Sequence, residues 1–90
     1  MENERRHIPN RLRMHRKLMR YSQKQVAHLL GLHPAQLSQW ENGLKLPSTL
    51  NLIKLSIIYR ALPTELYFEY FQELREQIKH KEWELFGRAS

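Results

Sequence analysis

Helix start and stop signals alternate closely within residues 22–43, and this spacing restricts the fold more than any other feature of the chain. Ser22 and Gln25 have the spacing of a capping box, in which the hydroxyl accepts the N3 amide and the Gln side chain reaches back to the cap. Pro34 favours a second helix start, because a proline in the first turn gives up an amide that would be unpaired anyway. The matching stop signals are Gly31 and Asn42-Gly43. We therefore expect two short helices joined by a tight turn.

The rest of the chain also has helical periodicity, with no strand-like alternation of useful length. Pro9 suits a first helical turn, and the apolar spacing predicts a helix over residues 9–21. A helix from Pro47 is apolar nearly all round, so we expect it to be the central core helix. Pro63 starts a last helix that we expect to continue to about Phe86, because neither Gly nor Pro interrupts it. The main stripe of the helix from Pro47 is Leu52, Leu55, Ser56 and Tyr59. The expected fold is all-α.

The charge of the chain is divided unevenly along its length. Residues 1–63 hold 11 Lys or Arg against three Glu, whereas residues 64–90 hold four against six. A basic module favours a polyanion, because each neutralised phosphate releases condensed counterions, but it also suits an anionic membrane surface. Charge alone does not choose between the two.

The composition narrows the classes of function. A chain of 90 residues forms one small domain with little room for a large enzyme pocket. It has no cysteine, which excludes disulfides, thiolate metal sites and thiol nucleophiles, and this favours a reducing cytoplasm. The apolar runs are too short to span a bilayer, and the charged start lacks the apolar core of a signal peptide. We therefore expect a cytoplasmic protein that is neither an enzyme nor membrane-bound.

The helix expected from Pro34 has two unlike faces at about 100° per residue. One face carries large side chains, and the other carries small or amide side chains and no long acid. Such an outward face can enter the major groove of DNA, where a Gln pairs with adenine and an Ala methyl contacts a thymine methyl. The inward residues are Leu37, Trp40 and Glu41, and the outward residues are Ala35, Ser38, Gln39 and Asn42. With the preceding helix, residues 22–42 have the outline of a helix-turn-helix.

A wider set of residues, spread over most of the chain, occurs at positions whose spacing as a set is highly specific. Its members are Leu12, Arg16, Ser22-Gln23, Val26-Ala27, Gly31, Ser38, Trp40, Glu41, Gly43, Pro47-Ser48, Leu52 and Leu66. On these residues, positions 11–66 resemble the XRE family of helix-turn-helix regulators, which includes the phage repressors and Cro proteins. The resemblance implies a five-helix repressor-like domain with a C-terminal helical extension. It also implies a sequence-specific binder of double-stranded DNA, a repressor or autoregulator whose dimers occupy half-sites about one helical turn apart.

The same resemblance implies which residues contact DNA. Gln23 and the positive end of its helix are expected to hold a phosphate, and Gln39 is the main candidate for base recognition. Two neighbouring positions hold Pro and Ala, which offer no polar side chain. Gln36, Ser38 and DNA shape are therefore expected to carry more of the discrimination. The full expected set is Gln23, Lys24, His33, Pro34, Ala35, Gln36, Ser38, Gln39, Asn42 and Lys45.

The resemblance also implies a structural ion pair. Glu41 corresponds to a buried acid of the family and Arg16 to its partner, so a bidentate pair is expected to join the first helix to the third. An acid beside Trp40, in an element directed at phosphate, needs such compensation.

Other chemistry has little support in the sequence. The five histidines have neither a metal-binding spacing nor an acidic cluster beside them, and the serines lack a His and acid arrangement, so we expect no metal, no cofactor and no catalysis. The basic residues near the N-terminus are compatible either with phosphate contacts or with a solvated face. These residues are Arg5, Arg6, Arg11, Arg13, Lys17 and Arg20.

We expect three parts in the chain: a flexible basic arm in residues 1–8, the DNA-binding domain in residues 9–66 and a helical extension in residues 67–90. The extension has an apolar and an acidic face. Its apolar stripe is Tyr67, Phe71, Leu74, Ile78 and Leu85, with Tyr70, Trp83 and Phe86 alongside and Glu65, Glu69, Glu73 and Glu76 on the other face. Because an exposed patch of this kind is rare on a monomer, the helix is expected either to fold back or to form a homodimer contact. The competing hypothesis is an antitoxin-type protein whose C-terminal helix docks a protein partner and whose DNA binding serves autoregulation.

Overall fold

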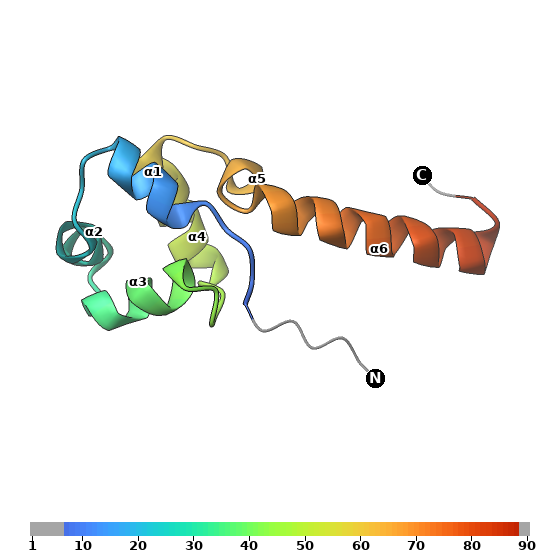
Figure 1. Cartoon of the computed structure of the whole chain (residues 1–90), viewed down its shortest axis with the longest axis horizontal. Helices are drawn as coiled ribbons and strands as arrows, with labels where there is room; N and C mark the ends of the chain where they lie inside the picture. Colours follow the sequence, from blue (N-terminus) through green and yellow to red (C-terminus); the bar gives the residue numbers. More distant parts are fainter. Residues whose placement is uncertain (1–6, 89–90) are drawn as a thin grey trace.

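The computed structural model describes residues 7–88, which form six helices and no strand. The helices are α1 Leu12–Leu18, α2 Gln23–Leu30, α3 Pro34–Glu41, α4 Thr49–Tyr59, α5 Pro63–Leu66 and α6 Phe68–Phe86. The first five pack into a module at one end of the molecule, and α6 extends away from it (Figure 1). The all-α prediction is confirmed. Most of the expected basic arm lies in residues 1–6, outside the described residues.

Local signals define the ends of α2 and α3. The Ser22 hydroxyl accepts the Gln25 amide at 3.0 Å, and the Gln25 side chain accepts the Ser22 amide at 2.8 Å, so the capping box forms. Gly31 ends α2 with φ of +73°, in the left-handed region where a side chain is disfavoured. α3 begins at Pro34, and the Nδ1 atom of His33 caps it by accepting the Ala35 amide at 3.0 Å.

One cluster of buried side chains holds the module together. It takes residues from every helix of the module, and five of its aliphatic members have no exposed surface. The cluster consists of Leu12, Val26, Leu30, Leu37, Trp40, Leu55, Tyr59, Ala61, Leu66 and Tyr67. Burial of each large apolar side chain contributes about 1.5 to 3 kcal/mol. This core keeps the short helices of the module in place.

The N-terminal segment differs from the prediction. α1 begins at Leu12, three residues later than expected, with Arg11 as its N-cap residue. The Asn10 side chain, just before this start, accepts the Leu12 amide at 3.0 Å. The same side chain donates to the carbonyl of Trp40 at 3.1 Å. The Ile8 amide donates to the carbonyl of Gly43 at 2.8 Å. The chain before α1 is therefore fixed against the end of α3 rather than continuing the arm.

The helix from Pro47 was expected to be the central core helix, but only one of its sides lies in the core. In α4 the expected stripe faces inward, with Leu55 and Tyr59 buried. The other side of α4 is in solvent, where Leu50, Ile53 and Ile57 are each more than half exposed. α4 packs against α2 and α5 only on its inward side, because a module of five short helices is too small to surround a central one.

The last helix is divided at Tyr67, where a single continuous helix was expected. This residue has φ −122° and ψ 43°, outside the helical region, and its side chain is buried in the core. Packing of the ring therefore overrides local helix propensity, which has no Gly or Pro to reveal the break. None of the residues of α6 is buried, so it does not fold back on the module (Figure 1). Among residues 7–88 there is no helix with the length and apolar character needed to cross a membrane.

Candidate nucleic-acid interface

α3 has one face in the core and one in solvent. Leu37, Trp40 and Glu41 are buried and fix the helix against α1 and α2. At eight residues α3 is too short to be stable alone, so this packing maintains it. On the solvent face, Ala35, Gln36, Gln39 and Asn42 are exposed and Ser38 is half-buried. The residues expected to contact bases therefore lie together on one rigidly held surface.

The buried Glu41 carboxylate receives hydrogen bonds from three side chains. Arg16 donates from Nε to Oε2 at 2.6 Å and from Nη2 to Oε1 at 3.1 Å. Gln23 donates from Nε2 to Oε1 at 2.9 Å, and Arg13 from Nε to Oε1 at 3.3 Å. Arg16 also donates from Nη1 to the Tyr21 carbonyl at 3.0 Å. The structure thus places Arg16 and Glu41 in bidentate contact and joins α1, α2 and α3 at one charged point.

Burial and hydrogen bonding act in opposite directions on Glu41. Burial raises the pKa of its carboxyl, because the charge is poorly solvated inside the protein. The hydrogen bonds from Arg16, Gln23 and Arg13, together with the positive charge of Arg16, outweigh burial and bring the pKa below its ordinary value of 4.5. The hydrogen bond to Glu41 also raises the pKa of Arg16. Both partners are therefore charged at neutral pH.

Gln23 has a partner inside the protein that the sequence did not indicate. Its side chain is half-buried, and its Nε2 atom donates to Glu41. Because an amide nitrogen carries two hydrogens, one bond to Glu41 leaves the second hydrogen for an acceptor outside the protein. Gln23 therefore links the first residue of α2 to the buried carboxylate of α3.

A chain of hydrogen bonds runs from Arg13 across the outward face of α3. Arg13 donates from Nη2 to Asn42 Oδ1 at 2.8 Å, and Asn42 donates from Nδ2 to Ser38 Oγ at 3.3 Å. Because a guanidinium has only donors, it determines which end of the Asn42 amide faces it. The Ser38 hydroxyl consequently accepts from Asn42 and keeps its own hydrogen for another acceptor.

The remaining residues of the expected set surround this face. Because His33 Nδ1 accepts the Ala35 amide, the neutral imidazole carries its proton on Nε2, which makes that atom a donor. Of the remaining members, Lys24 and Lys45 are exposed and Pro34 is half-buried. Within the described part of the chain, no group of three His, Cys, Asp or Glu side chains could hold a metal ion.

Asn10 is a residue of the site that the sequence analysis missed. Its Nδ2 atom donates to the carbonyls of Trp40 and Glu41 at 3.1 and 3.3 Å, which fixes the C-terminal end of α3. An Asn shortly before an apolar periodic residue such as Leu12 is a helix-cap signal. The neighbouring Pro9 is also a start signal, and it pointed to an earlier helix start.

The basic residues in α1 and in the segment just before it have different partners. Arg13 joins the network of α3, and no local pattern could have revealed this contact, because it spans 29 residues. Arg11 instead donates from Nε to Glu69 Oε2 at 3.0 Å, which directs it to the first turn of α6. Lys17 and Arg20 are exposed, and Arg5 and Arg6 lie outside the described residues.

The sequence of the module matches a known protein family. A family model described as helix-turn-helix matches residues 12–66, more than half of the chain. The chain belongs to the helix-turn-helix family. The resemblance to XRE regulators is thereby confirmed. The match ends with α5, so α6 lies beyond it.

One curated protein is similar to most of the chain. The HTH-type transcriptional regulator DicA of Escherichia coli (strain K12) is 34% identical over 68 residues, which are 76% of this chain and 50% of DicA. The chain therefore spans about half the length of this relative. No solved structure is a significant match.

Proposed function

We propose that this chain is a transcriptional regulator that binds specific sequences of double-stranded DNA with α3 in the major groove. The observation that carries the proposal is the outward face of α3, where small and amide side chains stand in solvent on a helix fixed by its buried face. The major groove admits an α-helix, and base edges there present distinct donors and acceptors. The name of DicA, a transcriptional regulator, supports the same function for the related module.

Base recognition is assigned to the exposed side chains of α3. Gln39 can form two hydrogen bonds with an adenine, and the Ala35 methyl can contact a thymine methyl. Because Ser38 accepts from Asn42, its hydroxyl can donate its own hydrogen to an acceptor on the DNA, such as a purine N7. Gln36 adds a second amide beside them.

Phosphate contacts are assigned to the residues that surround the outward face of α3. The second hydrogen of Gln23 Nε2 and the positive end of α2 favour an anion. Lys24, Lys45 and the Nε2 atom of His33 supply further donors, and the net charge of +6 supports a polyanionic partner. These contacts orient the module on the duplex without selecting a sequence.

The regulator is proposed to act as a homodimer in the cytoplasm without catalysis. Two modules on a near-palindromic site increase affinity through their effective concentration, and occupancy of the site blocks or recruits polymerase. The antitoxin-type alternative is not favoured, because the similar protein that supplies a functional name is a transcriptional regulator.

The proposal is tested by selecting bound fragments from random duplex DNA at two salt concentrations. We expect one sequence motif to be enriched at both, with affinity that falls steeply as salt rises. Recovery of fragments without any common motif, or binding that does not respond to salt, would contradict the proposal.

Gln39→Ala is expected to remove about 1 to 3 kcal/mol of preference at one base pair, roughly 5- to 150-fold, because the bidentate pair with the base is lost. Binding to the selected motif and to its single-base variants is measured by fluorescence anisotropy. Gln72→Ala is the matched control, because this exposed residue of α6 makes the same change outside the interface. An equal loss on motif and scrambled DNA would show that Gln39 does not recognise a base.

A further inference from the structure

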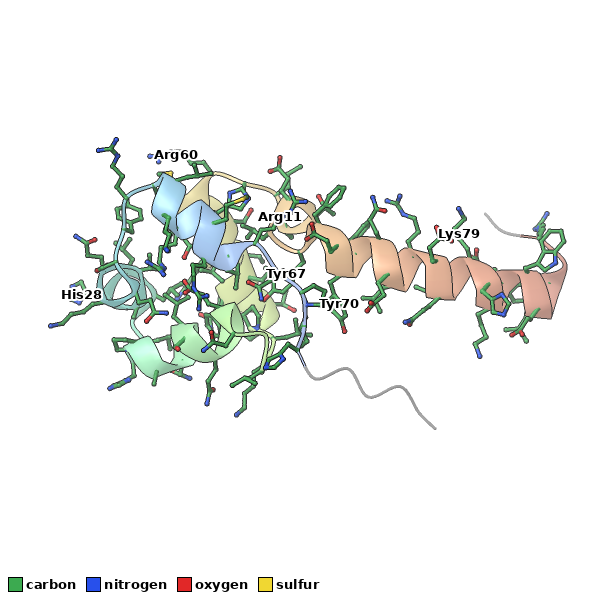
Figure 2. All side chains as sticks on the ribbon, viewed as in Figure 1. Arg11, His28, Arg60, Tyr67, Tyr70 and Lys79 are labelled. Atoms are coloured by element: carbon green, nitrogen blue, oxygen red, sulfur yellow. The ribbon has the colours of Figure 1, made fainter. Side chains whose placement is uncertain are left out.

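α6 carries an apolar face that nothing in the described chain covers. Phe71, Leu74, Ile78 and Leu85 recur at helical spacing along it, with 37% to 66% of each side chain exposed. A shallow groove follows this face, and charged residues of both signs line it beside the apolar ones. In Figure 2, Tyr67 and Tyr70 lie at the junction with the module, whereas Lys79 stands far out along the helix.

The first turn of α6 is attached to the module by a polar contact. Arg11 pairs with Glu69 there and lies over the Phe68 ring at 4.7 Å. The helix as a whole is long, since its 19 residues extend about 28 Å. A helix owes most of its stability to the packing of its apolar face, so this face needs a partner.

We propose that a second copy of the chain covers this face, with the two α6 helices paired antiparallel. Two of the three charged residues that line the groove, Arg75 and Glu82, are complementary when the two helices are antiparallel. Arg75 and Glu82 flank the apolar residues and line the same groove. When two antiparallel helices cross near Ile78, Arg75 of each copy lies opposite Glu82 of the other. The proposal names the surface of the homodimer in the proposed function and rests on that function.

Lys81 argues against the parallel orientation. It falls on the apolar face between Ile78 and Leu85 at coiled-coil spacing. In a parallel pair the two Lys81 ammonium groups would share one layer and repel each other. In the antiparallel pair each packs its stem against Ile78 of the other copy, and its charge reaches solvent.

The buried Tyr67 limits the register of the pair. Because this residue belongs to the core, the second helix cannot pack beside it. The apolar face open to a partner begins at Phe71. A register that places Leu85 of one copy against Leu74 of the other ends the second helix close to this point, so it is compatible with the module.

A charge exchange tests the pairing. Arg75→Glu and Glu82→Arg are each expected to weaken self-association about tenfold or more. The reason is that positions 75 and 82 meet twice in the symmetric pair, and each variant puts two like charges at both of these meetings. The double variant is expected to restore the dimer. Residues seven apart on one helix are about 10 Å apart and do not meet, so rescue reports contact between copies. Analytical ultracentrifugation gives the dissociation constants. Absence of rescue, or a wild-type chain that is monomeric at about 100 µM, would overturn the proposal.

Cysteine cross-linking tests the orientation, since the chain has no cysteine of its own. A disulfide forms only when the two Cα atoms lie within about 7 Å. We expect Leu74→Cys mixed with Leu85→Cys to give a cross-linked dimer on mild oxidation, and Leu85→Cys alone to give almost none. Efficient cross-linking of Leu85→Cys with itself would identify a parallel pair and overturn the proposal.

A third variant separates this inference from the proposed function. Ile78→Glu is expected to abolish self-association measured without DNA, whereas Gln72→Glu adds the same charge on the far side of α6 and is expected to leave the dimer intact. Circular dichroism verifies that the module stays folded. If wild-type chains pair as described but bind no DNA motif, the proposed function fails and the pairing stands. If Ile78→Glu leaves the dimer unchanged, the pairing fails, whatever the DNA result.

Discussion

Arg16→Ala is expected to lower the free energy of unfolding by about 3 to 5 kcal/mol, because it leaves the buried Glu41 carboxylate without its bidentate partner. The total free energy of unfolding of a small domain is only about 5 to 15 kcal/mol, so the variant should lose much of its stability. Urea denaturation at pH 7 measures the change. An unchanged unfolding midpoint would contradict the assigned role of the pair.

Arg13→Ala is the matched control. Arg13 also contacts Glu41, but its side chain is 48% exposed, compared with 11% for Arg16. An ion pair screened by solvent to this extent contributes about 0 to 1 kcal/mol. A loss from Arg13→Ala as large as that from Arg16→Ala would show that burial of the pair is not what matters.

The effect of Arg16→Ala should depend on pH. In the wild type the pKa of Glu41 is lowered, so its contribution to stability is present above the ordinary value of 4.5 and is lost as pH falls through the folded value. Without Arg16, burial raises the pKa, and protonation of Glu41 at low pH removes the cost of a buried charge. The difference in stability between the two proteins should therefore narrow from pH 7 to pH 3.

Gly43→Ala is expected to lower the free energy of unfolding by about 2 to 5 kcal/mol, which is the sum of two effects. Gly43 has φ of +74°, which disfavours any side chain. A Cβ atom there would also lie 2.5 Å from the carbonyl oxygen and 2.7 Å from the amide nitrogen of Ile8, and backbone atoms cannot move aside as a flexible side chain can. The chain before α1 would have to leave the end of α3. Thermal unfolding followed by circular dichroism measures the loss.

Gly31→Ala separates the two effects. Gly31 has nearly the same φ, but a Cβ atom there would meet nothing within 4 Å. Its cost should be limited to the conformational part, about 1 to 2 kcal/mol. Equal losses at the two glycines would show that the contact with Ile8 contributes nothing.

The sequence alone determined the helix ends and helix faces that depend on residues close together in the chain. The capping box of Ser22 with Gln25, the turn at Gly31 and the start at Pro34 each act within four residues, so they define α2 and α3 before any tertiary contact forms. The two faces of α3 follow from the same local periodicity. For this reason the outward residues could be named from the sequence.

Tertiary structure decided the features that depend on which helices meet. The break at Tyr67 arises because the core takes its ring, although local propensity favours a continuous helix. The exposed side of α4 follows from the small number of helices around it. The contact of Arg13 with Asn42 joins residues 29 apart in the chain. Hydrogen bonds within a helix turn can be inferred from neighbouring residues, whereas contacts across the module depend on the packed arrangement of all its helices.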